Sequence, residues 1–247
     1  MRHVTRFAGP LTGLILAVVI GATPVLAAAA PGTVAGAPRA AQAEELNSRR
    51  HCAPEWLAAR ADPTVENLQA VGFCEIDRRL VTIERLGKAV DDARALTDEH
   101  QAALETILDN SAAGLRALRA KIASDTTVPE LRADIKAIFT DYRIYALVTR
   151  QVWLVRAADT ADVAGARLTD TADRLETLIA QAEANGKDVT EAKTHLAAME
   201  AAIAEALAGV DGVADEVLLL TPADWNAGTA GPVLRSAREA IAEARSD

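Results

Sequence analysis

The sequence lacks the residue patterns that mark the common catalytic and cofactor sites. Only four histidines are present, and His51, His100 and His195 lie too far apart in the chain for the spacing of metal ligands. No glycine-rich phosphate loop follows a predicted strand, and no Gly-x-Ser-x-Gly turn is present to carry a nucleophilic serine. We therefore predict a non-catalytic protein that has no cofactor and no metal site.

An excess of basic residues is also missing. The chain has 26 Lys and Arg residues against 35 Asp and Glu residues, which gives a net charge of −9. Removal of residues 1–27 would take Arg2 and Arg6 and no acidic residue, so 24 basic residues against 35 acidic ones would leave −11. Because binding to a phosphate backbone needs a basic face, nucleic acid is not an expected partner.

Long apolar runs are absent outside the N-terminus. Residues 11–20 are largely apolar, follow the two arginines, and lead to the small residues of a cleavage site near Ala27. We predict that residues 1–27 are a cleaved signal peptide. An uncleaved anchor helix is the alternative, which Pro24 and the short run disfavour. The protein is then expected to be secreted or extracellular, with the cell wall as a candidate place of association.

Nothing after the signal peptide is predicted to span a membrane. The most apolar later segment, residues 142–155, has only 14 residues and contains Arg143 and Arg150, which is typical of a buried helix. Residues 28–43 are rich in Ala, Gly and Pro and poor in large apolar side chains, so we expect a disordered leader. Residues 44–247 are then expected to form a single helical-bundle domain.

Cysteine is scarce as well, and both cysteines lie near the start of that domain. In an exported protein Cys52 and Cys74 are expected to form a disulfide, with two buried free thiols as the alternative. The bond would close a loop of 22 residues and contribute about 3 kcal/mol on the chain-entropy model. It would staple an N-terminal flap, which we expect to end at Gly72 and Cys74, to the rest of the bundle.

A helical stretch at residues 127–155 is the centre of the predicted fold. Apolar residues recur there in steps of four and three, as on a helix that packs against other helices. They are Leu131, Ile135, Ile138, Tyr142, Tyr145 and Val152. Beyond Tyr142 nearly every face is apolar, so we expect this half to be buried all round. We also expect a kink or break between Arg150 and Gly165, where the apolar face changes character.

The same periodicity, together with capping residues, predicts further helices at 75–95, 99–123, 189–207 and 232–245. The link between the first two of them has only a few residues, and such short links make neighbouring helices antiparallel. Residues 223–231 are expected to form a loop. Asp-Thr-Ala-Asp occurs at 159–162 and again at 170–173, and we interpret both acidic pairs as solvated helix surface. The predicted fold class is all-α, a mostly antiparallel, coiled-coil-like helical bundle of four to six helices with a disulfide-stapled N-terminal flap.

Candidate binding residues lie along the polar edge of the central stretch. Arginine next to aromatic side chains suits recognition of a carboxylate or a sugar ring. The candidates are Asp141, Tyr142, Arg143, Tyr145, Arg150 and Trp153. Alternatively, the aromatic residues belong to the core and the charged ones tie neighbouring helices together. Trp225 is a further candidate, which either lies exposed as a contact point or plugs the end of the bundle.

Two functions fit these residues. The first is an exported, non-catalytic interaction or structural module of the cell envelope or extracellular space, with an unknown protein or cell-wall partner. The alternative is a small-ligand-binding bundle with a pocket near Tyr142, Arg143, Tyr145 and Trp153, because bundles build sites between facing helices. A hydrolase with an unfamiliar site would need converging acids with raised pKa values, and the sequence singles out none.

Four short segments stand out: Asp125-Thr126-Thr127, Thr140-Asp141-Tyr142-Arg143-Ile144-Tyr145, Ala157-Ala158-Asp159 and Leu220-Thr221-Pro222-Ala223. They resemble a family of uncharacterised secreted α-helical proteins from high-GC Gram-positive bacteria, and the resemblance runs from about Cys74 to the C-terminus. Members of that family often have proline near Arg150 and histidine near Trp153, and this chain departs at both positions. The resemblance implies export and a helical fold, and it supplies no catalytic residue.

Overall fold

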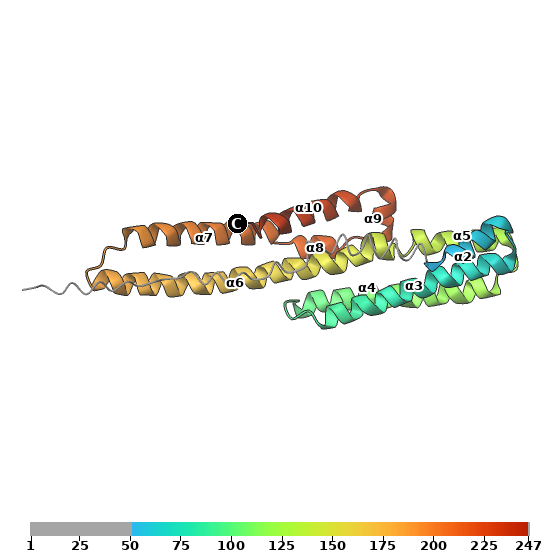
Figure 1. The fold of residues 1–247 in the computed structure, drawn as a ribbon, viewed down its shortest axis with the longest axis horizontal. Coiled ribbons are helices and arrows are strands. Elements are labelled where there is room, and N and C mark those ends of the chain that lie inside the picture. The colour runs from blue at the N-terminus through green and yellow to red at the C-terminus, as the bar shows by residue number, and fades with distance from the viewer. Residues whose placement is uncertain (1–50, 247) are drawn as a thin grey trace, which may run out of the picture. The chain divides into compact units, whose positions relative to one another are not determined.

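Helices form every regular element in residues 51–246, the part of the chain that the computed structural model describes (Figure 1). They are α2 (Ala53–Ala61), α3 (Val65–Asp91), α4 (Asp98–Ser124), α5 (Val128–Thr140), the π-helical turn η2 (Ile144–Val148), α6 (Thr149–Ala184), α7 (Thr190–Val210), α8 (Val213–Leu218), α9 (Pro222–Ala227) and α10 (Ala230–Glu243). No strand occurs in residues 51–246, so the all-α prediction is confirmed. The predicted signal peptide (1–27) and leader (28–43) lie outside the described residues.

Threonine side chains begin four of these helices. Each hydroxyl oxygen accepts a hydrogen bond from the backbone N–H three residues further on, which satisfies one of the donors that a helix start leaves unpaired. The four residues are Thr64, Thr97, Thr127 and Thr221. Proline in the first turn of α2, α5 and α9 adds a fixed backbone angle that suits the start of a helix.

α3 is longer than predicted, and its additional turns carry the disulfide. It begins at Val65 and not at residue 75, so the prediction that Gly72 and Cys74 end a flap is wrong. A side-chain carbon on Gly72 would lie only 2.9 Å from Cδ1 of Ile122, so the glycine lets α3 and α4 approach closely. Cys74 is bonded to Cys52, the residue before α2, with 5.8 Å between their Cα atoms. The predicted disulfide is therefore confirmed, and it holds α2 against α3.

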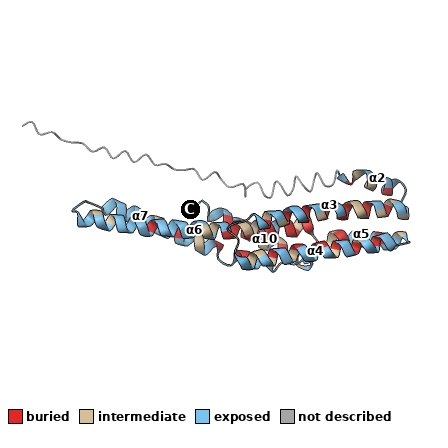
Figure 2. Ribbon diagram, turned by 90° about the horizontal axis from the view of Figure 1, so that it is seen from below, coloured by how far each residue is buried: buried red, intermediate tan, exposed pale blue. Residues whose placement is uncertain are grey.

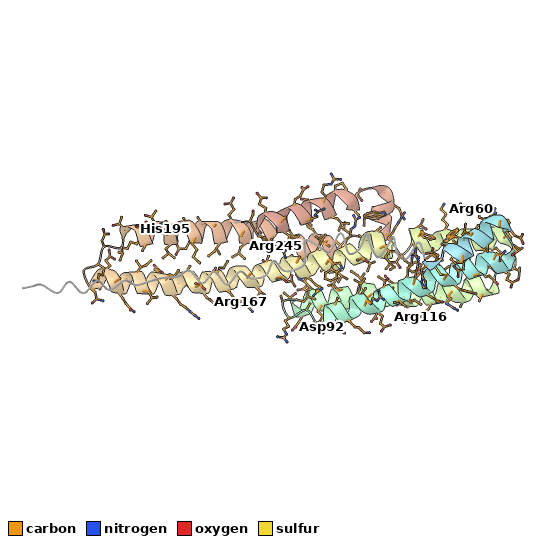
Figure 3. The ribbon with its side chains drawn as sticks, in the orientation of Figure 1. Arg60, Asp92, Arg116, Arg167, His195 and Arg245 are labelled. Carbon is orange, nitrogen blue, oxygen red and sulfur yellow. A yellow bond between two sulfur atoms is a disulfide. The ribbon has the colours of Figure 1, made fainter. Side chains whose placement is uncertain are left out.

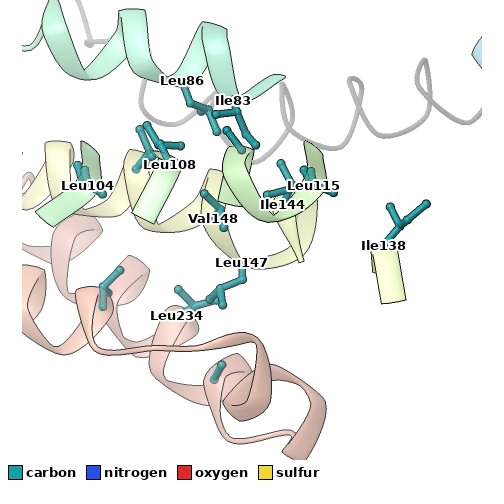
Figure 4. Packing of buried hydrophobic residues seen from close by; sticks show 14 of the residues in the cluster. Ile83, Leu86, Leu104, Leu108, Leu115, Ile138, Ile144, Leu147, Val148 and Leu234 are labelled. Carbon is teal, nitrogen blue, oxygen red and sulfur yellow. The ribbon is translucent and has the colours of Figure 1, made fainter. Parts of the chain in front are cut away.

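One hydrophobic core joins α3, α4, α5, η2, the first part of α6, α8 and α10 (Figure 4). Leu115, Ile138 and Leu147 are among its fully buried side chains. Six of the described helices have 13 residues or more, and α3 and α4, like α6 and α7, pack side by side as antiparallel neighbours. The predicted bundle of four to six mostly antiparallel helices is thus confirmed.

Residues 127–155, predicted to form one helix, fold as three elements. α5 ends at Thr140, Arg143 adopts a left-handed conformation with φ of 46°, and η2 then leads into α6. A left-handed backbone costs a non-glycine residue roughly 1 kcal/mol, so contacts from elsewhere in the chain must stabilise this break. Asn226 of α9 provides them by bonding to Thr140 and Arg143. The kink predicted between Arg150 and Gly165 is wrong, because α6 continues unbroken through this range.

Burial beyond Tyr142 largely follows the prediction. Ile144, Leu147 and Val152 are all buried, whereas Arg150 is exposed. The prediction of a loop at residues 223–231 is wrong, because this range contains α9 and the start of α10. A reciprocal capping box at the start of α9 explains the helix there. The backbone N–H of Asp224 donates to the side chain of Thr221, and the backbone N–H of Thr221 donates to the side chain of Asp224.

Exposure separates the two halves of the long α6 helix. In Figure 2 the buried residues gather where α6 meets the main core, and the half of α6 that pairs with α7 is mostly exposed. All described residues belong to one compact unit. None of their helices has both the length and the apolar composition that crossing a membrane requires.

Candidate functional site

The candidate site is a pocket of about 500 Å³ at the surface between α2, α3, α5 and η2. Its lining combines two kinds of side chain that suit ligand binding, aromatic rings and guanidinium groups. The aromatic residues are Trp56, Phe139 and Tyr145, and the charged residues are Arg60, Arg78, Arg79 and Glu75. We call these seven residues the Glu75 pocket. Figure 3 labels Arg60, which lies on α2.

Glu75 is the centre of the pocket's polar network. It lies on α3 with only 2% of its surface exposed, and its Oε1 accepts a 2.8 Å hydrogen bond from the indole Nε1 of Trp56. Its Oε2 accepts bonds of 2.6 Å from Nε of Arg78 and from Nη1 of Arg79. The three residues of α3 meet because positions three and four residues apart share one face of a helix. The disulfide holds α2 in place, so Trp56 can reach the same carboxylate.

Aromatic rings hold the two guanidinium groups in position. The Cζ atom of Arg79 lies 4.5 Å from the ring centre of Phe139 and 5.2 Å from that of Tyr145. Arg78 is the second guanidinium group on Tyr145, with its Cζ atom 5.0 Å from the centre of that ring. The ring of Trp56 is tilted against that of Phe139, with 6.4 Å between centres. Such contacts add attraction between cation and ring when the groups are shielded from water.

The electrostatic balance of the Glu75 pocket is positive. Burial by itself would raise the pKa of Glu75, but the bond from Trp56 and the charges of Arg79 and Arg78 lower it below its ordinary value. Glu75 is therefore ionised at neutral pH, and it neutralises one of the pocket's three arginines. Among the described residues, Nη1 of Arg78 and Nε of Arg79 find no hydrogen-bond acceptor. Two buried guanidinium groups share the single negative charge of Glu75, so the cluster keeps a net positive charge that favours an incoming anion.

Chemically, the arrangement can bind and it offers little for catalysis. The arginines can hold a carboxylate or phosphate group, and the rings can cover a flat or apolar part of the same molecule. The only carboxylate of the pocket already accepts bonds from three side chains, so it is poorly placed to accept a proton from a substrate. Within residues 51–246, no cluster of His, Cys, Asp and Glu has the arrangement of a metal site.

Of the residues predicted from sequence, only Tyr145 lines this pocket. Tyr142 instead packs on Gly114 of α4, where an added side-chain carbon would lie 2.5 Å from its Cε1 atom. Arg143 is bonded to Asn226, and Asp141 is exposed and accepts a hydrogen bond from its neighbour Thr140. The structure therefore does not bring Tyr142, Arg143 and Trp153 together into one site.

The two candidate tryptophans outside the pocket each lie beneath an arginine. Arg156 lies over the ring of Trp153 at 4.8 Å, and Arg150 lies over Trp225 at 5.2 Å. Trp225 is half-buried in α9 and packs against the main core. Trp225 is thus neither a fully exposed contact point nor a fully enclosed plug. It lies in α9, the helix whose Asn226 stabilises the break before η2.

Six of the seven pocket residues were missed by sequence reasoning, and the signal for them was weak. Glu75, Arg78 and Arg79 have the spacing of an ordinary helical ion pair, which is common on solvated helices. Phe139 stands in the apolar central stretch, where an aromatic residue usually belongs to the core. Trp56 lies within the loop that the disulfide closes, and its approach to Glu75 depends on how α2 folds back onto α3.

A second polar cluster lies at the start of α4. Asp159, predicted as solvated surface, is only 2% exposed, so that prediction is wrong for this residue. Its carboxylate accepts a 2.9 Å bond from the backbone N–H of Thr97 and lies 2.8 Å from Nδ1 of His100. Nε2 of His100 lies 3.3 Å from Asp215 of α8. Although burial lowers it, the pKa of His100 is raised overall because both carboxylates stabilise the imidazolium.

Comparison of the chain with protein-family models, with curated proteins and with solved structures finds no match.

Proposed function

We propose that this protein is an exported, non-catalytic binding protein whose Glu75 pocket takes up a small anionic ligand with an apolar or flat body. The observation that carries the proposal is the surplus of guanidinium groups over carboxylates in a pocket walled by three aromatic rings. A volume of about 500 Å³ lies within the range of known ligand pockets. The chain as a whole is acidic, so a positive pocket is not a consequence of its general composition.

Export is part of the same proposal. The disulfide supports it, because such bonds persist in oxidising compartments. The N-terminal sequence supports it through its charged, apolar and small-residue order. A role at the cell envelope, with the ligand drawn from the surroundings of the cell, is the form of the interaction-module hypothesis that we favour.

Binding of decanoate tests the proposal, with decyltrimethylammonium as a probe of the same chain length and opposite charge. In a Trp153→Phe, Trp225→Phe background the fluorescence of Trp56 reports on the pocket alone. We expect decanoate to change this fluorescence and the cationic probe to have little effect. Arg79→Gln should weaken decanoate binding by about tenfold or more, since a charge-assisted bond is lost.

Two further variants separate binding from folding. Arg60→Gln removes a charge at the pocket without touching the bonds of Glu75, and it should weaken decanoate binding in a folded protein. Arg119→Gln is the matched control, because this arginine stacks on Phe73 outside the pocket. Equal affinity for both probes, or decanoate binding that ignores Arg60 and Arg79, would contradict the proposal.

A further inference from the structure

The outer parts of α6 and α7 form a two-helix hairpin with a thin core. Figures 1 and 2 show no other described helix beside this part of the molecule. Its buried side chains are Ala172, Leu196 and Ile203 alone, a cluster separate from the main core. At its base, a side-chain carbon on Gly165 would clash with Leu207, so the two backbones lie close together. Two helices by themselves bury little apolar surface, so such a hairpin is expected to need a cover.

One face of this hairpin carries leucines that no described helix covers. Leu168, Leu175 and Leu178 are 47%, 38% and 58% exposed, although leucine is usually buried. In the heptad that places Gly165 and Ala172 at position a, these leucines occupy positions d, d and g.

Three apolar side chains occupy d and g positions of α7. Taking Leu196 and Ile203 as position a, they are Met199, Ala202 and Ala206, all half-buried, while His195 is an exposed polar residue at a g position. In an antiparallel pair the d and g edges of both helices lie on the same side of the seam. We call Leu168, Leu175, Leu178, Met199, Ala202 and Ala206 the hairpin face.

The two borders of the hairpin face carry opposite charges. At heptad position c, beside the g edge, α6 presents Arg167 and Arg174, and α7 presents Glu191 and Glu205. All four side chains belong to exposed residues, and Figure 3 labels Arg167 on the part of α6 that pairs with α7. One border is basic and the other is acidic. The face is therefore complementary to a second copy of itself when the α6 border of one hairpin meets the α7 border of the other.

We propose that the hairpin face binds a second copy of this chain, and that the two hairpins form an antiparallel four-helix bundle. With the two-fold axis parallel to the helices, α6 of one copy lies against α7 of the other. Gly165 faces Leu207, so Arg167 is level with Glu205 within one hairpin. Rotation about this axis does not move a residue along the helices, so Glu205 of the second copy stays at the height of Arg167. The rotation therefore brings Arg167 of one copy beside Glu205 of the other. A two-fold axis across the helices would instead set the arginine border against itself, which repulsion disfavours.

The mass of the mature protein in solution, measured by sedimentation velocity over a wide range of concentrations, tests this proposal. We expect a dimer. Leu168→Ser and Leu175→Ser should each raise the dissociation constant by about tenfold or more, because each removes a large apolar contact. Leu219→Ser is the control, since Leu219 is 78% exposed and lies outside the hairpin.

Charge reversal tests the arrangement. Arg167→Glu and Glu205→Arg should each weaken the dimer, and the double variant should recover most of the loss because the pair is restored with its signs exchanged. A monomer at every concentration would overturn the proposal, whether the face proves to be covered by the chain's own N-terminal segment or by another protein. A dimer that tolerates both leucine changes would overturn it as well.

Discussion

Arg143 and Asn226 are 83 residues apart in the chain, yet Nε of Arg143 donates a 2.8 Å hydrogen bond to Oδ1 of Asn226. The amide of Asn226 in turn donates a 2.9 Å bond to the carbonyl oxygen of Thr140, the last residue of α5. These bonds join both sides of the helix break to α9. The arginine that the sequence offered as a ligand contact therefore stabilises the fold.

Substitution of Arg143 should separate its bonds from its backbone strain. Arg143→Ala loses the bonds to Asn226 and keeps an unfavourable left-handed backbone, so we expect a loss of about 2 kcal/mol in the free energy of unfolding. Arg143→Gly loses the same bonds but tolerates φ of 46°. Its free energy of unfolding should therefore fall by less than that of Arg143→Ala, with a difference of up to about 1 kcal/mol between the two variants. Urea unfolding followed by circular dichroism compares the two. Equal losses would show that the backbone of this residue is unstrained.

Glu75→Gln should destabilise the protein and tighten anion binding. The change keeps the shape of the side chain but leaves two buried guanidinium groups without their counter-charge, which costs about 3 kcal/mol or more. The same surplus of positive charge should increase the affinity for decanoate. Urea unfolding and Trp56 fluorescence measure the two effects, and Glu84→Gln, which alters an exposed pair on the same helix, is the control. Weaker decanoate binding in a folded Glu75→Gln variant would contradict the assignment of the pocket.

Stability should fall with rising pH through the titration of His100. Its folded-state pKa is raised above the ordinary value of 6.5 by Asp159 and Asp215, against the opposing effect of burial. Below that ordinary value the imidazolium is charged in both states, and its bonds stabilise the fold in full. As pH rises through the raised pKa the folded state loses this proton, and about 1.4 kcal/mol disappears for each unit of difference between the two pKa values.

Urea midpoints measured on both sides of neutral pH check this prediction. His100→Gln should flatten the decline above the ordinary histidine pKa, because the linked proton is removed. His195→Gln is the control, since that side chain is 76% exposed. If the profile of His100→Gln matches that of the unchanged protein, the cluster does not contribute as described.

Two glycines should respond to alanine in opposite directions. A side-chain carbon at Gly114 would lie 2.5 Å from Cε1 of Tyr142, so Gly114→Ala should displace the ring and cost about 1–3 kcal/mol. Gly87 in α3 has no atom within 4 Å of the same position, so Gly87→Ala should stabilise the helix by up to about 1 kcal/mol. Thermal and urea unfolding measure both. Similar effects at the two sites would mean that Tyr142 does not depend on Gly114 for its space.

The positions of the helices could be predicted from local sequence patterns, but the break in the central helix could not. The second helix was predicted at 99–123 and forms at Asp98–Ser124, because its apolar spacing and the cap at Thr97 are both contained in its own sequence. The break at Arg143 has no comparable local signal, since no glycine or proline stands there. It depends on Asn226, which approaches only after α9 has folded beside it.

The sequence by itself determined an all-helical chain with antiparallel neighbours and a Cys52–Cys74 bond, because periodicity, caps and the scarcity of cysteine are properties of the chain alone. Only the tertiary structure decided that Asp159 is buried against His100 and that Trp56, Glu75 and Arg79 meet in one pocket. The physical reason is that burial and partnership of a charge depend on which helices pack around it. Helical spacing fixes the face on which a residue lies, and packing fixes what that face meets.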